Sequence, residues 1–276
     1  MVSGVIEFNT TNILSFIKNP YSKNDDFPES EYILVTLAFT FLFFKIYSRN
    51  RVITSFFRYE AIFDKLSSQQ QEEWKQKIVS MVHALIVAPL SLKVYWDTKY
   101  IPYSEIGAYQ SNMSLTHIIL AIGGAYFIWD FYICILKFKH SGIANLLHAI
   151  LGLSSIINVV VPNDRPMFQT FVALMFVTEI STIPLNLKFF QYHIDSVSKR
   201  NEQYSLIFAI LFIVFRNIII VPLVIVAAIN LMLNPIEFYK TILLLFHAIL
   251  IIGLNSYWGW LIVKKLYKHL IKTKLN

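Results

Sequence analysis

The stretch 126-YFIWDFYICILKFKHSGIANLLHAILG-152 consists of two apolar segments joined by a short basic turn, 137-KFKHSG-142. Aromatic and aliphatic residues fill both segments, which is typical of helices that lie in lipid. Asp130 and His148 interrupt them, although an ionisable residue inside a membrane costs at least about 2.5 kcal/mol on insertion scales. The stretch therefore predicts a helical hairpin in the membrane with a functional polar site near its turn.

The whole chain has the composition of a membrane protein. Of its 276 residues, 56% are hydrophobic and 15% are charged, and the mean hydropathy is +0.55. A soluble domain usually carries about a quarter charged residues. The net charge of +7 comes mostly from residues that flank apolar segments, so it indicates membrane orientation and not binding to nucleic acid. A single cysteine, Cys134, provides neither a disulfide framework nor a zinc pattern, and we expect no metal or cofactor.

The fold class predicted is all-α, a polytopic membrane protein with about seven transmembrane helices. Seven apolar segments approach or exceed the roughly 18–20 residues that span a bilayer, and the first is the shortest. The second is preceded by a predicted capping box formed by Ser68 and Gln71. The seven segments are 32–47, 77–96, 114–136, 143–161, 167–189, 205–233 and 239–264.

Basic residues predict the orientation of these segments. Lys and Arg concentrate after the first, third and fifth segments and in the C-terminal tail, which places the N-terminus in the lumen and the tail in the cytosol. The sequons at Asn9 and Asn112 fall on the predicted lumenal side, and whether they are glycosylated stays open. Lys272 and Lys274 resemble a dilysine retrieval signal of endoplasmic reticulum membrane proteins, although they equally fit a simple charge excess. The predicted location is the endoplasmic reticulum membrane.

Polar residues inside the segments are predicted to form one chamber that opens toward the cytosol. A rise of 1.5 Å per residue places the ionisable ones between roughly 8 Å below the cytosolic face and the middle of the membrane. His247 falls in the lumenal half and is assigned a structural role. Gly123 would allow a neighbouring helix or a ligand to approach closely. The predicted chamber residues are His83, Asp130, His148, Glu179, Asn186, Arg216 and Asn255.

Each of these residues also has a purely structural interpretation. Asp130 or Glu179 could pair with Arg216 to hold two helices together. His83 and His148 could be hydrogen-bonded histidines of the core. The asparagines most often form hydrogen bonds between membrane helices.

The polar residues fall in phrases that occur in a fixed order, one per segment. They include a Trp-x-x-x-x-Val-Ser-x-x-His-Ala phrase at 74–84, Gly-x-Tyr-Phe-x-x-Asp at 124–130, His148, 179-EISTIPLN-186, Arg216-Asn217 followed by Pro222, and 254-LNSYW-258.

This series resembles the TLC-domain family, which groups ceramide synthases, translocation-associated proteins and small lipid-homeostasis proteins. The chain is most similar to the small stand-alone TLC domain-containing proteins. The resemblance implies a barrel of six helices around a lipid-accessible chamber, built from the last six segments. It divides the chain into an N-terminal lumenal segment with the first helix and connector (1–59), the TLC domain (60–270) and a cytosolic tail (271–276).

One departure from the ceramide synthases bears on function. Those enzymes carry two adjacent histidines in the fourth segment, which act in acyl transfer from acyl-CoA to a long-chain base, whereas this chain has His148 followed by Ala149. We therefore expect a lipid-homeostasis protein whose chamber binds or handles a phospholipid or sphingolipid, without a claim of catalysis.

Two alternatives stay open. An acyl-CoA-dependent acyltransferase would use His148 as base or nucleophile, with Asp130 or Glu179 to orient it and basic connectors to attract CoA phosphates. A transporter or receptor is disfavoured because no internal repeat relates two halves of the chain. The sequence does not indicate which lipid binds, nor the oligomeric state.

Overall fold

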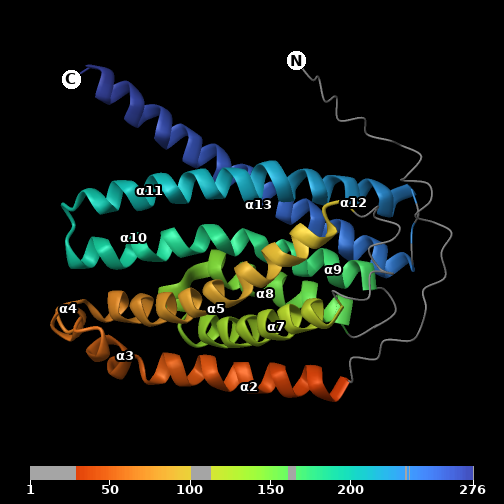
Figure 1. Cartoon of the computed structure of the whole chain (residues 1–276), viewed down its shortest axis with the longest axis horizontal. Coiled ribbons are helices and arrows are strands. Elements are labelled where there is room, and N and C mark those ends of the chain that lie inside the picture. Colours follow the sequence, from red (N-terminus) through yellow and green to blue (C-terminus); the bar gives the residue numbers. More distant parts are fainter. Residues whose placement is uncertain (1–28, 101–112, 161–165, 234, 236, 276) are drawn as a thin grey trace.

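The computed structural model describes residues 29–100, 113–160, 166–233, 235 and 237–275, which are helical almost throughout and contain no strand. The sequons at Asn9 and Asn112 lie outside the described residues. The long helices run side by side along the longest dimension of the molecule, and α3, α4 and the α10–α11 connection lie at the same end (Figure 1). The all-α, polytopic class predicted from the sequence is confirmed.

Helices occupy all seven predicted segments. Six of them are long and apolar enough to cross a membrane. The fourth lies in α8, whose described apolar part is Asn145–Val160, and Gly142, with a φ of 74°, interrupts this helix near its start. The helices are α2 (Glu29–Ser48), α3 (Asn50–Phe56), α4 (Glu60–Phe63), α5 (Ser68–Thr98), α7 (Met113–Leu136), α8 (Phe138–Val160), α9 (Pro166–Met175), η2 (Phe176–Ser181), α10 (Thr182–Ile194), α11 (Lys199–Phe212), η3 (Ile213–Ile220), α12 (Val221–Leu233) and α13 (Phe238–Leu275).

The capping box of α5 lies one residue earlier than predicted. Ser67 Oγ accepts a hydrogen bond from the Gln70 amide at 3.3 Å, and Gln70 Oε1 accepts one from the Ser67 amide at 3.0 Å. The sequence 67-SSQQQ-71 allows two registers. The earlier one is adopted because the Gln71 side chain instead donates to the Phe63 carbonyl, which joins the start of α5 to the end of α4.

The first long helix packs on the bundle formed by the others. α2 contacts α7 and α5, and the Tyr32 hydroxyl donates to the Leu120 carbonyl at 3.3 Å. Phe43 is fully buried, with its ring edge toward both His83 and Tyr126. The opposite face of α2 exposes large apolar side chains such as Leu34 and Leu37, as expected for a surface that contacts lipid.

Candidate functional site

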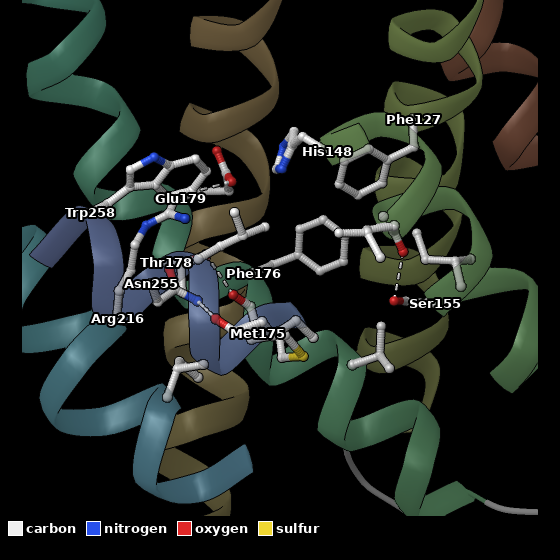
Figure 2. Close-up of a pocket in the computed structure, with 17 residues that line it drawn as sticks. Phe127, His148, Ser155, Met175, Phe176, Thr178, Glu179, Arg216, Asn255 and Trp258 are labelled. Atoms are coloured by element: carbon white, nitrogen blue, oxygen red, sulfur yellow. Dashed lines mark hydrogen bonds and ion pairs between the residues drawn. The ribbon is translucent and has the colours of Figure 1, made fainter. Parts of the chain in front are cut away.

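The site is a largely apolar cavity of about 120 Å³, here called the chamber, enclosed mainly by α7, α8, α9, η2, η3 and α13 (Figure 2). Aromatic rings, aliphatic side chains and a small set of polar groups line it together. This combination suits a ligand with an apolar body and a polar end. The lining residues are Phe127, His148, Leu151, Gly152, Ser155, Ile156, Val172, Met175, Phe176, Thr178, Glu179, Arg216, Ile220, Ile251, Leu254, Asn255 and Trp258.

A largely buried ion pair forms the charged part of the chamber. Arg216 Nη2 lies 3.8 Å from Glu179 Oε1, and the two side chains are 14% and 13% exposed. The Arg216 Nε donates to Ser181 Oγ at 3.2 Å. At 3.8 Å the guanidinium and carboxylate attract each other without a direct hydrogen bond. Both groups therefore keep hydrogen-bonding capacity that a ligand could use.

Two irregular helical turns position this ion pair. Glu179 lies on the 3₁₀ segment η2 and Arg216 on the π-helical segment η3, and the two segments pack together. Each is followed closely by a proline, Pro184 or Pro222, which removes a backbone N–H and clashes with the carbonyl four residues earlier. Departures from α-helical hydrogen bonding are therefore expected just before each proline. Such turns are frequent at functional sites.

His148 lies on the boundary between the chamber and a second cavity. Its imidazole lies edge-on to Phe127, with ring centroids 5.5 Å apart, and Figure 2 shows it beside the chamber with Phe127 and Glu179. It also lines a more polar cavity of about 220 Å³, here called the vestibule, between the start of α5, the end of α7 and the start of α8. The other vestibule residues are Gln69, Glu73, Gln76, Lys77, Ser80, Tyr126, Trp129, Asp130, His140 and Asn145.

Asp130 lines the vestibule and not the chamber. It accepts a long hydrogen bond from Cys134 Sγ at 3.7 Å, and no described hydrogen bond joins it to His148. Asp130 and His148 thus lie along the same cavity. The residue that pairs with Arg216 is Glu179, one of the two partners considered from the sequence.

His83 and Asn186 line neither cavity. His83 is 1% exposed and stacks on Tyr126 at a centroid distance of 4.0 Å, and neither of its ring nitrogens has a hydrogen-bond partner among the described residues. Asn186 is fully buried and donates to Ser80 Oγ, which links α10 to α5. Asn186 therefore has the geometry of a contact between helices.

Asn255 and His247 both connect helices. Asn255 lines the chamber, and its backbone carbonyl accepts from Asn217 Nδ2 at 3.0 Å. His247 Nδ1 bonds the Leu243 carbonyl and its Nε2 bonds Ser154 Oγ, both at 2.7 Å. This arrangement accords with the structural role expected for His247.

Sequence reasoning missed the two aromatic walls of the chamber, Phe127 and Phe176. Aromatic residues are common in every segment, so Phe176 carried no distinguishing signal, and Phe127 stood in the phrase at 124–130 without being assigned to the site. A usable signal lay in the glycines opposite them. A Cβ atom at Gly152 would lie 2.2 Å from the Phe127 ring, and one at Gly123 would lie 2.2 Å from the Phe176 ring. The close approach expected at Gly123 is thus made by the Phe176 side chain of η2.

The described His, Cys, Asp and Glu residues include no group of three or more that could hold a metal ion. The site therefore offers an ion pair, an imidazole and apolar walls. Chemically these can bind a charged or polar head group and accept or release a proton at His148.

Comparison with known proteins assigns the chain to a family. A TLC domain is matched over residues 73–264. Over 250 residues, 88% of this chain and 90% of the relative, the sequence is 35% identical to TLC domain-containing protein 4 C of Dictyostelium discoideum. It is 25% identical over 154 residues to an uncharacterized TLC domain-containing protein of Schizosaccharomyces pombe, covering 54% of this chain and 48% of that one. These relatives are stand-alone TLC proteins, as the sequence predicted, and the chain belongs to the TLC-domain family.

Proposed function

We propose that this protein acts in lipid homeostasis in the endoplasmic reticulum membrane by binding a phospholipid or a sphingolipid in the chamber. The observation that carries the proposal is the chamber itself, an apolar cavity inside a membrane helix bundle with a loosely paired arginine and carboxylate on its wall. Membership of the TLC-domain family supports a lipid-related role. A membrane lipid has the matching chemistry, an apolar body and a charged or polar head group.

In this proposal the two parts of the chamber hold the two parts of the lipid. Phe127, Phe176 and Ile156 contact an acyl chain. Arg216 supplies guanidinium donors that suit a phosphate, and a charge-assisted hydrogen bond to it is stronger than a neutral one. Glu179 attracts an ammonium group of the head group or accepts a hydrogen bond from one of its hydroxyls.

Sequence features support the proposed location and orientation. The basic connectors and the tail lysines favour a lumenal N-terminus and a cytosolic C-terminus. With this orientation the vestibule, at the α7–α8 turn, opens on the cytosolic side.

Filling the chamber tests the proposal. Ser155 lines the chamber, whereas Ile157 on the same helix is 48% exposed on the outer surface. We expect Ser155→Phe to reduce the lipid that co-purifies with the protein by at least about tenfold, because the ring occupies space the acyl chain needs. Ile157→Phe, the matched control, should retain it. The measurement is mass spectrometry of lipid extracted from protein purified in mild detergent. Equal lipid content in both variants and the wild type would place the lipid outside the chamber.

A second function is favoured by one observation, the place of His148 between the vestibule and the chamber. Acyl-CoA could enter through the vestibule, with its thioester beside His148 and its acyl chain in the chamber. His148 would take the proton from an amine or hydroxyl acceptor as its nitrogen or oxygen attacks the thioester carbonyl. The C–S bond would then break, CoA would leave as the thiol after proton transfer, and an amide or ester would form.

An acyl-transfer assay in microsomes distinguishes the two functions. We expect wild-type protein, supplied with acyl-CoA and amine or hydroxyl acceptors, to give no more product than His148→Ala at equal protein level. This result, together with a co-purifying lipid, fits a binding protein. A product that His148→Ala abolishes without lowering the amount of protein would instead establish the acyltransferase.

A further inference from the structure

A second candidate lipid site lies on the outer surface, away from the chamber. α2 and α7 form a groove of about 290 Å³ near their C-terminal ends, here called the α2–α7 groove. Phe41, Tyr132 and Leu136 line it and are 62%, 50% and 58% exposed. Phe44 meets Tyr132 edge-on across it, with ring centroids 5.3 Å apart. In a membrane protein, exposed apolar side chains of this kind face acyl chains.

Two lysines line the same groove. Lys45 lies in the last turn of α2, and Lys137 follows the last residue of α7. Lys45 Nζ lies 5.0 Å from the Phe41 ring, and within the described ranges no carboxylate lies within 4.0 Å of it. Lys45 therefore has a charge that no described acidic side chain neutralises.

The surrounding charges leave this end of the groove positive. Glu72 is shared by Lys75, at 3.4 Å, and by Lys137, at 3.9 Å. Lys75 also lies over the ring of Tyr47, which lines the groove. Lys75 and Lys137 thus share one carboxylate, and Lys45 has none within 4.0 Å, so an anion is attracted there and a cation is repelled.

We propose that the α2–α7 groove binds an anionic phospholipid of the surrounding membrane. Its phosphate lies between Lys45 and Lys137, and one acyl chain lies along Phe41 and Tyr132. Basic residues between helices at the end of their apolar segments recognise anionic head groups in this way. The lipid contacts both α2, which precedes the matched region, and α7, which lies inside it. It therefore holds the first helix against the TLC domain.

Native mass spectrometry of the full chain in detergent tests this proposal. The probes are phosphatidylserine and phosphatidylcholine with identical acyl chains, offered together. We expect the wild type to retain phosphatidylserine in preference, and Lys45→Gln with Lys137→Gln to reduce that retention by at least about tenfold. Lys65→Gln with Lys139→Gln, an equal loss of charge at exposed positions outside the groove, should preserve it. Equal loss in both double variants, or no loss in the first, would overturn the proposal.

Two further arms locate the bound lipid. Ser155→Phe fills the chamber, and it should keep the preference for phosphatidylserine because the groove is unchanged. Loss of the preference in that variant would place the lipid in the chamber and contradict the groove site. Glycerol 3-phosphate, which has a phosphate but no acyl chain, should compete poorly. Full competition at equal concentration would show a simple anion site and equally overturn a lipid-binding groove.

Discussion

Arg216→Gln is expected to destabilise the protein by about 3 kcal/mol, the lower end of the range found when one partner of a buried ion pair is removed, because this pair is partly exposed and not hydrogen-bonded. The substitution leaves the Glu179 carboxylate, which is 13% exposed, without its cation. It also replaces the guanidinium that donates to Ser181. The measurement is the thermal unfolding midpoint in detergent together with the amount of protein in membranes, both of which should fall.

The double variant Glu179→Gln with Arg216→Gln separates structure from function. It removes both charges at once, so no unpaired ion remains, and most of the lost stability should return. If the chamber binds a charged head group, the double variant should still fail to retain the co-purifying lipid. A stable double variant that keeps its lipid would show that the pair only holds η2 and η3 together. A double variant as unstable as Arg216→Gln would contradict the ion-pair argument.

The fold could be predicted largely because the membrane imposes a simple rule. A segment must be apolar over its whole crossing, so composition alone located all seven helices. The fourth was predicted at 143–161, whereas α8 begins earlier, at Phe138, with a break at Gly142 that hydropathy does not register. The cap of α5 was displaced by one residue for a similar reason. Two serines and three glutamines permit two registers, and only the contact of Gln71 with Phe63 distinguishes them.

For the site residues, the sequence predicted a depth in the membrane but not the direction in which each side chain points from its helix. Counting residues along each segment places His148, Glu179, Arg216 and Asn255 between the cytosolic face and the middle of the membrane, and these four do line one chamber. The count gives no angle about each helix axis. It therefore could not show that Asp130 lines the vestibule or that His83 is stacked on Tyr126. The 3₁₀ and π turns change the angle further, and their only sequence signals are Pro184 and Pro222.

Ala149 stands where ceramide synthases have their second histidine, and its burial allows a prediction about that difference. Ala149 is fully buried, while its neighbour His148 lines both cavities. Successive residues of a helix point in directions about 100° apart, so the two side chains have different surroundings. The side chain of a second histidine, at position 149, would therefore point into the packed interior between helices and not into either cavity.

Ala149→His should therefore lower the thermal unfolding midpoint without adding acyl transfer. Overpacking costs about 1–3 kcal/mol, and burial of an imidazole without a partner adds a cost of about 1–3 kcal/mol. Ala149→Ser is the control, because its small hydroxyl can bond a carbonyl of its own helix and should cost little. The assay offers acyl-CoA and a long-chain base and measures the amide product. Wild-type stability of Ala149→His would show that there is room beside His148. An amide product in that variant would then show that one side chain separates lipid binding from acyl transfer in this chain.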